Sequence, residues 1–61
     1  STDRQFILDA VKVNGMALEY VGVIFQADRE IVLEAVKNGG SAIQFSDPFL
    51  QTDHDIVRAA S

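Results

Sequence analysis

The sequence contains no cysteine and no tryptophan, and it has a single proline, Pro48, and a single histidine, His54. Without cysteine there is neither a disulfide framework nor a thiolate metal site, and a zinc site would need several carboxylates around His54. Folding must therefore rest on apolar packing, which the 48% content of hydrophobic residues makes feasible. The 61 residues form one small domain, residues 1–61, with a small core.

Positive charge is also scarce, because five lysine and arginine residues face nine aspartate and glutamate residues, and the formal net charge is −4. Nucleic acids and anionic membranes select clustered cations, whereas these are scattered, so neither is expected as a partner. No apolar run approaches the ~20 residues of a membrane span, and no signal peptide opens the chain. The missing initiator methionine indicates a processed chain or an excised fragment. The lack of cysteine favours an intracellular location.

The chain repeats itself with a period of 25 residues, marked by Asp3, Asp28 and Asp53. Repeat one (3–27) and repeat two (28–52) align without a gap, and a partial third repeat covers 53–61. Nine positions are identical between the first two copies: Asp3/Asp28, Arg4/Arg29, Leu8/Leu33, Ala10/Ala35, Val11/Val36, Lys12/Lys37, Gly15/Gly40, Ala17/Ala42 and Gln26/Gln51. Each copy is therefore expected to build the same element, and stacked copies to cover apolar faces that one copy leaves open.

Apolar residues recur with a helical period at the start of each copy, for example Phe6, Ile7, Ala10 and Val11 in the first. The recurring aspartate is expected to cap each helix, with Thr2 and Thr52 as competing caps. Glycines should end the helices by adopting a left-handed conformation. Longer helices are expected at residues 3–13, 28–38 and 53–60, and shorter ones at 16–22 and 41–46. A β-hairpin in place of each short helix is the alternative.

These patterns predict an all-α fold with two 25-residue helix–turn–short-helix repeats and a partial third helix, as a small helical bundle or solenoid fragment. In the segments that close the two repeats, Ile24, Phe25, Phe49 and Leu50 are expected to plug the core, and the aromatic residues to be core residues. The predicted core is Ile7, Leu8, Val11, Leu18, Tyr20, Ile31, Val32, Leu33, Val36, Ile43, Phe45 and Ile56.

The stretches "DRQFILDAVKVNGMALEY" and "DREIVLEAVKNGGSAIQF" carry a family resemblance. An Asp-Arg pair, an aliphatic run ending in Ala-Val-Lys, Asn-Gly or Gly-Gly, and then Ala-Leu-Glu-Tyr or its equivalent resemble the domain of unknown function 4116. The resemblance spans nearly all of residues 3–60. It implies small helical repeats, often in tandem within larger proteins. The family has no assigned catalytic residues, so the resemblance transfers none.

Candidate catalytic and binding groups all have a simpler structural interpretation. In "DHD" around His54, three adjacent residues on a helix point about 100° apart and do not converge on one ion. Glu30 and Glu34 share a face of the second long helix, but it is the polar face. Gly39-Gly40 lacks the strand and lysine of a phosphate loop. No catalytic residue, metal or cofactor is therefore expected.

The leading functional interpretation is a non-catalytic protein-interaction or scaffold segment of a larger protein. The alternative is an accessory domain of an enzyme whose catalytic part lies outside this chain. The third copy keeps Ile56 and Val57 but has Arg58 where the first two have leucine. Ile56, Val57 and Arg58 are expected to form an edge that packs against a protein partner or further copies of the repeat. Weak self-association is a possible consequence, and a terminal cap is the alternative.

Overall fold

The computed structural model describes residues 2–61, and within them it contains helices and no strand. The all-α prediction is therefore confirmed. Four α-helices and three 3₁₀-helices follow one another along the chain: α1 (Asp3–Val13), η1 (Gly15–Tyr20), α2 (Val23–Gln26), α3 (Arg29–Asn38), η2 (Gly40–Phe45), η3 (Leu50–Thr52) and α4 (His54–Ala60).

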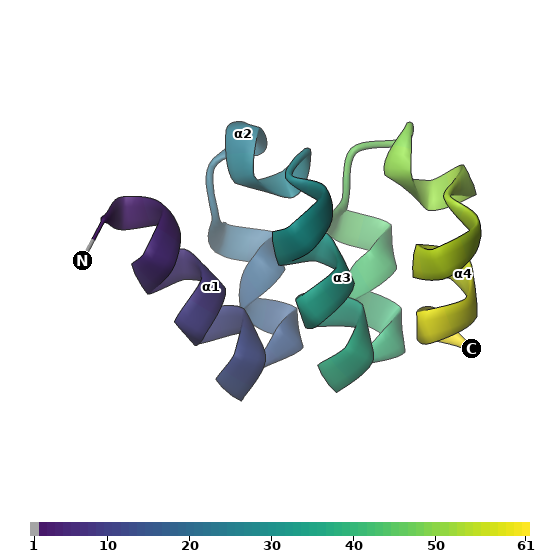
Figure 1. Cartoon of the computed structure of the whole chain (residues 1–61), viewed down its shortest axis with the longest axis horizontal. Helices are drawn as coiled ribbons and strands as arrows, with labels where there is room; N and C mark the ends of the chain where they lie inside the picture. Colours follow the sequence, from purple (N-terminus) through teal and green to yellow (C-terminus); the bar gives the residue numbers. More distant parts are fainter. Residues whose placement is uncertain (1) are drawn as a thin grey trace.

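The helices form two layers (Figure 1). The helices α1, α3 and α4 lie side by side in one layer, with α3 in the middle, and η1 and η2 form the layer behind them. The short α2 and the segment leading into η3 lie along one edge of both layers. The same order of elements follows α1 and α3, although the division of the chain into repeats stays a prediction.

The helix caps differ from the expectation at the first helix. The Thr2 hydroxyl oxygen accepts a hydrogen bond from the Gln5 amide at 3.1 Å and caps α1, whereas Asp3 lies inside the first turn. Asp28 and Asp53 cap α3 and α4 as expected. Threonine is itself a good N-cap, so the cap moves one residue forward where Thr2 precedes the aspartate.

The glycine turns were predicted for the wrong reason, because no glycine among residues 2–61 has a positive φ. Gly15 and Gly40 are instead points of close approach between backbones. A Cβ atom on Gly15 would overlap the carbonyl oxygen of Ala35, and one on Gly40 would overlap that of Ala60. Each 3₁₀-helix can therefore lie directly against the next α-helix only because its first residue has no side chain.

The core centres on α3 and includes most of its predicted members. Those that are fully or almost fully buried are Leu8, Val11, Leu18, Ile31, Val32, Val36 and Ile56, joined by Ala35, Ala42 and Leu50. Ile7, Leu33, Ile43 and Phe45 are half-buried and pack against this core. Tyr20 was predicted wrongly: it is 84% exposed, because no part of residues 2–61 packs on its side of η1.

The connecting segments contribute one apolar side chain each to the core, not the two expected. Leu50 is buried and Phe25 is half-buried, whereas Ile24 is 79% exposed and Phe49 is 84% exposed. The two segments are also joined, because the backbone amide of Asp47 donates to the Gln26 carbonyl at 2.9 Å. The prediction that Ile24 and Phe49 plug the core was therefore wrong, since only one residue of each short turn can face inward.

Candidate functional site

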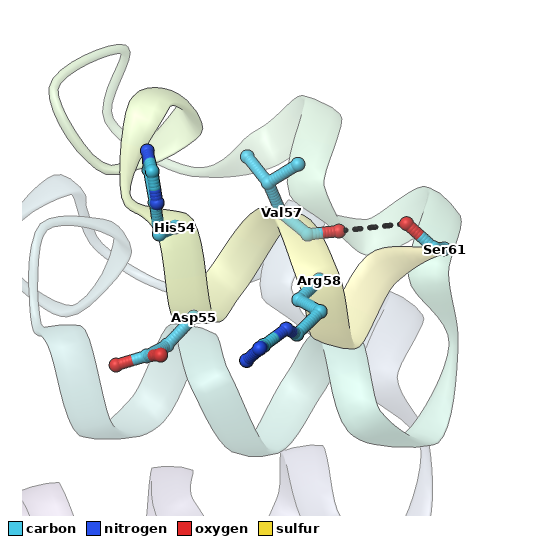
Figure 2. Close-up of a pocket in the computed structure, with 5 residues that line it drawn as sticks. All are labelled: His54, Asp55, Val57, Arg58 and Ser61. Atoms are coloured by element: carbon cyan, nitrogen blue, oxygen red, sulfur yellow. Dashed lines mark hydrogen bonds between the residues drawn. The ribbon is translucent and has the colours of Figure 1, made fainter.

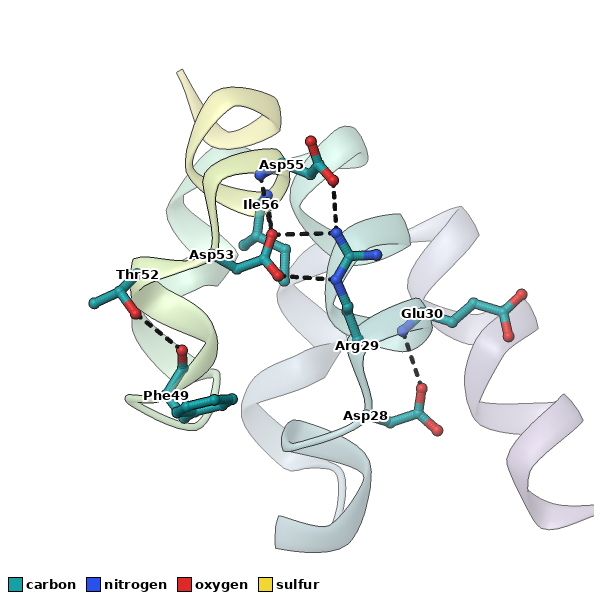
Figure 3. A network of polar contacts seen from close by, with 8 residues as sticks. All are labelled: Asp28, Arg29, Glu30, Phe49, Thr52, Asp53, Asp55 and Ile56. Atoms are coloured by element: carbon teal, nitrogen blue, oxygen red, sulfur yellow. Dashed lines mark hydrogen bonds and ion pairs between the residues drawn. The ribbon is translucent and has the colours of Figure 1, made fainter.

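An arginine at the start of one α-helix reaches the start of the next. The Arg4 guanidinium donates to both carboxylate oxygens of Asp28 at 2.8 and 3.0 Å, and to Glu30 at 2.7 Å. Twenty-five residues further on, Arg29 donates to both oxygens of Asp53 at 2.8 and 3.2 Å. It also donates to Asp55 at 2.7 Å, as Figure 3 shows. These contacts fix the order and spacing of the three α-helices.

Each of these aspartates is also a helix cap. The Oδ1 atom of Asp28 accepts from the amides of Glu30 and Ile31 at 3.1 and 3.2 Å. The hydrogen bond from Arg4 lowers the pKa of Asp28 below its ordinary value of 3.8, and these amides act in the same direction against partial desolvation. The pKa of Asp53 is lowered in the same way, chiefly by Arg29. The charged form of both carboxylates is therefore stabilised in the folded chain.

We expect Asp28→Asn to lower the melting temperature at pH 7 by a few degrees and to weaken its dependence on acid. Because the folded pKa of Asp28 is depressed, its contribution is present above pH 3.8 and is lost as the pH falls below that value. Asparagine caps a helix about as well as aspartate, so the variant removes the charge and keeps the cap. Melting curves between pH 7 and pH 2 measure the effect.

The control is Glu19→Gln, which neutralises an exposed acid of η1 outside the ion pairs of residues 2–61. It should leave both the melting temperature and its acid dependence close to those of the parent chain. Equal acid dependence in the Asp28→Asn and parent chains would show that the pair with Arg4 does not stabilise the fold.

The outer side of α4 ends the row of helices and is polar; we call it the C-terminal face. A shallow open hollow of about 520 Å³ runs along it (Figure 2), lined by His54, Asp55, Val57, Arg58 and Ser61. All five residues belong to α4 or directly follow it, so the hollow has a single wall. Within it the Ser61 hydroxyl donates to the Val57 carbonyl at 3.1 Å. One helix cannot surround a small molecule, so the hollow is a surface and not an enclosed pocket.

The opposite end of the row is apolar. The residues of α1 and η1 that point away from α3 and η2 form what we call the N-terminal face: Phe6, Ala10, Val13, Ala17 and Tyr20. Phe6 is 70% exposed, and Val13 and Tyr20 are each 84% exposed. A second exposed group, which we call the apolar ridge, lies on the connecting segments and consists of Val23, Ile24 and Phe49.

The family relationship follows from a comparison with known protein families. The description "Domain of unknown function (DUF4116)" matches over residues 3–51 and again over residues 28–60. The chain belongs to this family. Neither a curated protein nor a solved structure matches the chain. Because the second DUF4116 match begins at Asp28, it takes in α3, η2 and α4.

The edge predicted from the sequence is only partly exposed in this DUF4116 domain. Val57 is 43% exposed and Arg58 is exposed, and both lie on the C-terminal face. Ile56 is fully buried between α4 and the rest of the core, so it cannot contact a partner. The error has a simple cause: Ile56 stands 25 residues after Ile31, and both face the preceding helix.

The exposed apolar residues of the DUF4116 domain were missed because the sequence places them at positions that are buried elsewhere in the chain. Phe6 corresponds to Ile31, and Tyr20 corresponds to Phe45. The hydroxyl of Tyr20 was the available signal, because a tyrosine in a core needs a hydrogen-bond partner. The exposure of Phe49 had no comparable signal.

Polar groups of the DUF4116 domain do not gather into a metal site among residues 2–61, where no three histidine, cysteine or acidic side chains are suitably placed. Glu34 pairs with Lys37 at 3.3 Å on the surface of α3, while Glu30 pairs with Arg4. The two glutamates thus have separate partners. No helix within residues 2–61 has the length and hydropathy to cross a bilayer.

Proposed function

We propose that this chain is a non-catalytic protein-interaction or scaffold module, and that its apolar ridge is a contact surface for a protein partner. The observation that carries the proposal is the outward position of Ile24 and Phe49. They stand 25 residues apart on two connected segments, and each is about four-fifths exposed. A side chain of that size adds little to the fold when it faces solvent, whereas burying it against a partner is worth about 1.5–3 kcal/mol.

The ridge is also held in place, which favours binding. The side-chain amide of Gln26 donates to the Leu18 carbonyl at 2.9 Å, and that of Gln51 donates to the Ile43 carbonyl at 3.1 Å. These bonds attach the connecting segments to η1 and η2. A surface that is ordered before binding loses less conformational entropy when a partner binds, so more of the contact energy appears as affinity.

We expect the double variant Ile24→Ser/Phe49→Ser to keep its melting temperature within a few degrees and to lose at least about tenfold in affinity for a ridge partner. Both side chains are exposed, so their loss should be nearly neutral for the fold. The partner is first trapped through a photo-reactive phenylalanine analogue at position 49, then purified. Its affinity for the parent and variant chains is measured by titration calorimetry.

The matched control is Gln44→Ser, which changes an exposed polar side chain of η2 away from the ridge. It should bind the purified partner as tightly as the parent chain. If the double variant binds with parental affinity while its fold is intact, the ridge is not the contact surface. If position 49 and position 44 trap the same proteins equally, the capture is non-specific and the proposal fails.

A further inference from the structure

The N-terminal face has the residues of an interface that is already formed twice within the chain. Phe6 on α1 is 70% exposed, whereas Ile31 and Ile56, which stand 25 and 50 residues later, are fully buried. Ile31 is covered by α1 and η1, and Ile56 by α3 and η2. The position of Phe6 thus faces a neighbouring unit in both cases in which a neighbour is present.

The layer behind α1 is open on the same side. Tyr20 of η1 is 84% exposed, whereas Phe45 of η2 is half-buried. Ala17 is half-buried, whereas Ala42 is fully buried. The uncovered area therefore spans both layers, as the face of α3 and η2 would if α1 and η1 were removed. Its occupant has to supply an α-helix with a 3₁₀-helix behind it.

Charge gives the second requirement on the occupant. Asp28 and Asp53 each receive both donors of an arginine from the preceding helix, at 2.8–3.2 Å. Asp3 stands 25 residues before Asp28 in the first turn of α1 and is exposed. No lysine or arginine among residues 2–61 forms an ion pair with it. An arginine placed like Arg4 would meet Asp3 in the geometry that Arg4 has with Asp28.

A second copy of this chain does not meet these requirements with its C-terminal face. At the positions of Arg29, Leu33 and Val36, that face carries His54, Arg58 and Ser61. The arginine is missing, and two aliphatic contacts are replaced by a charged and a polar side chain. Its helix α4 also has no 3₁₀-helix behind it within the described residues.

We infer that the N-terminal face docks a separate helical unit of the same kind. This unit has an arginine at the position of Arg4 and aliphatic residues at the positions of Leu8 and Val11. Its arginine binds Asp3, its aliphatic residues cover Phe6 and Ala10, and the glycine of its 3₁₀-helix lies against the Ala10 carbonyl. This surface is separate from the apolar ridge, so the ridge can be correct or incorrect independently of it.

The test supplies such a unit from the chain itself. A second copy of residues 3–27 is inserted directly before Asp3 of the complete chain, so that Asp3 follows an alanine as Asp28 does. The melting temperature of this extended chain should exceed that of the parent by at least about 5 °C, because the added interface buries Phe6 and Tyr20. Hydrogen exchange of the original α1 amides should slow at the same time.

Two substitutions show whether the added copy docks where we infer. Phe6→Gln in the original α1 should barely change the melting temperature of the parent chain, where Phe6 is exposed, and should lower that of the extended chain by at least about 5 °C. Changing the arginine of the added copy to glutamine should remove part of the gain. Removing the aliphatic residues at its Leu8 and Val11 positions should abolish the gain.

Equal melting temperatures of the parent and extended chains would overturn the inference, as would equal effects of Phe6→Gln in both. A parent chain that sediments as a dimer, and becomes monomeric with Phe6→Gln, would also overturn it, because a second copy would then be the occupant. None of these outcomes bears on partner binding by Ile24 and Phe49, so a failure here is distinct from a failure of the proposed function.

Discussion

Replacing Ile31 with alanine is expected to unfold much of the chain even without denaturant. Ile31 has no exposed surface and lies where α1, η1 and α3 meet. Removing three buried carbons from such a site costs about 2–5 kcal/mol. A core in a domain below ~70–80 residues rarely supplies more than ~3–5 kcal/mol, so the loss is comparable with the whole stability. Urea titrations followed by circular dichroism measure it.

The matched control is Ile24→Ala, which makes the same chemical change at a side chain that is 79% exposed. Its unfolding free energy should stay within about 0.5 kcal/mol of the parent value. If the two alanine variants unfold at the same urea concentration, the assignment of Ile31 to the core is wrong.

Gly15→Ala is expected to destabilise the fold by about 1–3 kcal/mol or more, although it adds a single methyl group. The new Cβ would overlap the Ala35 carbonyl oxygen, and this atom belongs to the backbone of α3. A flexible side chain could turn aside, but here η1 or α3 must move as a whole. Gly40→Ala should behave alike, because its Cβ would overlap the Ala60 carbonyl. Thermal melting of both variants measures the cost.

Gly39→Ala is the control for both glycine variants. Nothing lies within 4 Å of a Cβ at Gly39, and its backbone has φ −153° and ψ 109°, which alanine adopts freely. This variant should be neutral or more stable by about 0.4–1 kcal/mol, because alanine restricts the unfolded chain. A loss of stability at Gly39 equal to that at Gly15 would mean that glycine acts through backbone freedom and not through close approach.

The helices were predictable because their local signals agree with one another. The period of the apolar residues, the aspartates at the helix starts and the glycines after the helix ends all mark the same boundaries, so α1, α3 and α4 were placed within one residue. Even the short helices were located, although as 3₁₀-helices their period is three and not 3.6.

Features that depend on distant parts of the chain could not be read in the same way. The reason for Gly15 is the carbonyl of Ala35, twenty residues away, and the local sequence equally suits a left-handed turn. Arg4 and Asp28 are identical to Arg29 and Asp53 across the alignment, but their pairing emerges only when the helices lie side by side. Repetition hid Tyr20 and Phe6, because equal sequence positions were given equal burial although the first unit has no neighbour on one side.

The contact of Gly15 with Ala35 has a consequence for how freely the sequence can vary. Main-chain atoms, and not side chains, set the distance between η1 and the next helix, and Gly40 with Ala60 sets the following one. Substitutions among the core side chains then alter how strongly the helices are held together but not how far apart they lie. Ile24 and Phe49 therefore keep a constant separation while the interior diverges, and the chain acts as a ruler whose divisions are written in its backbone.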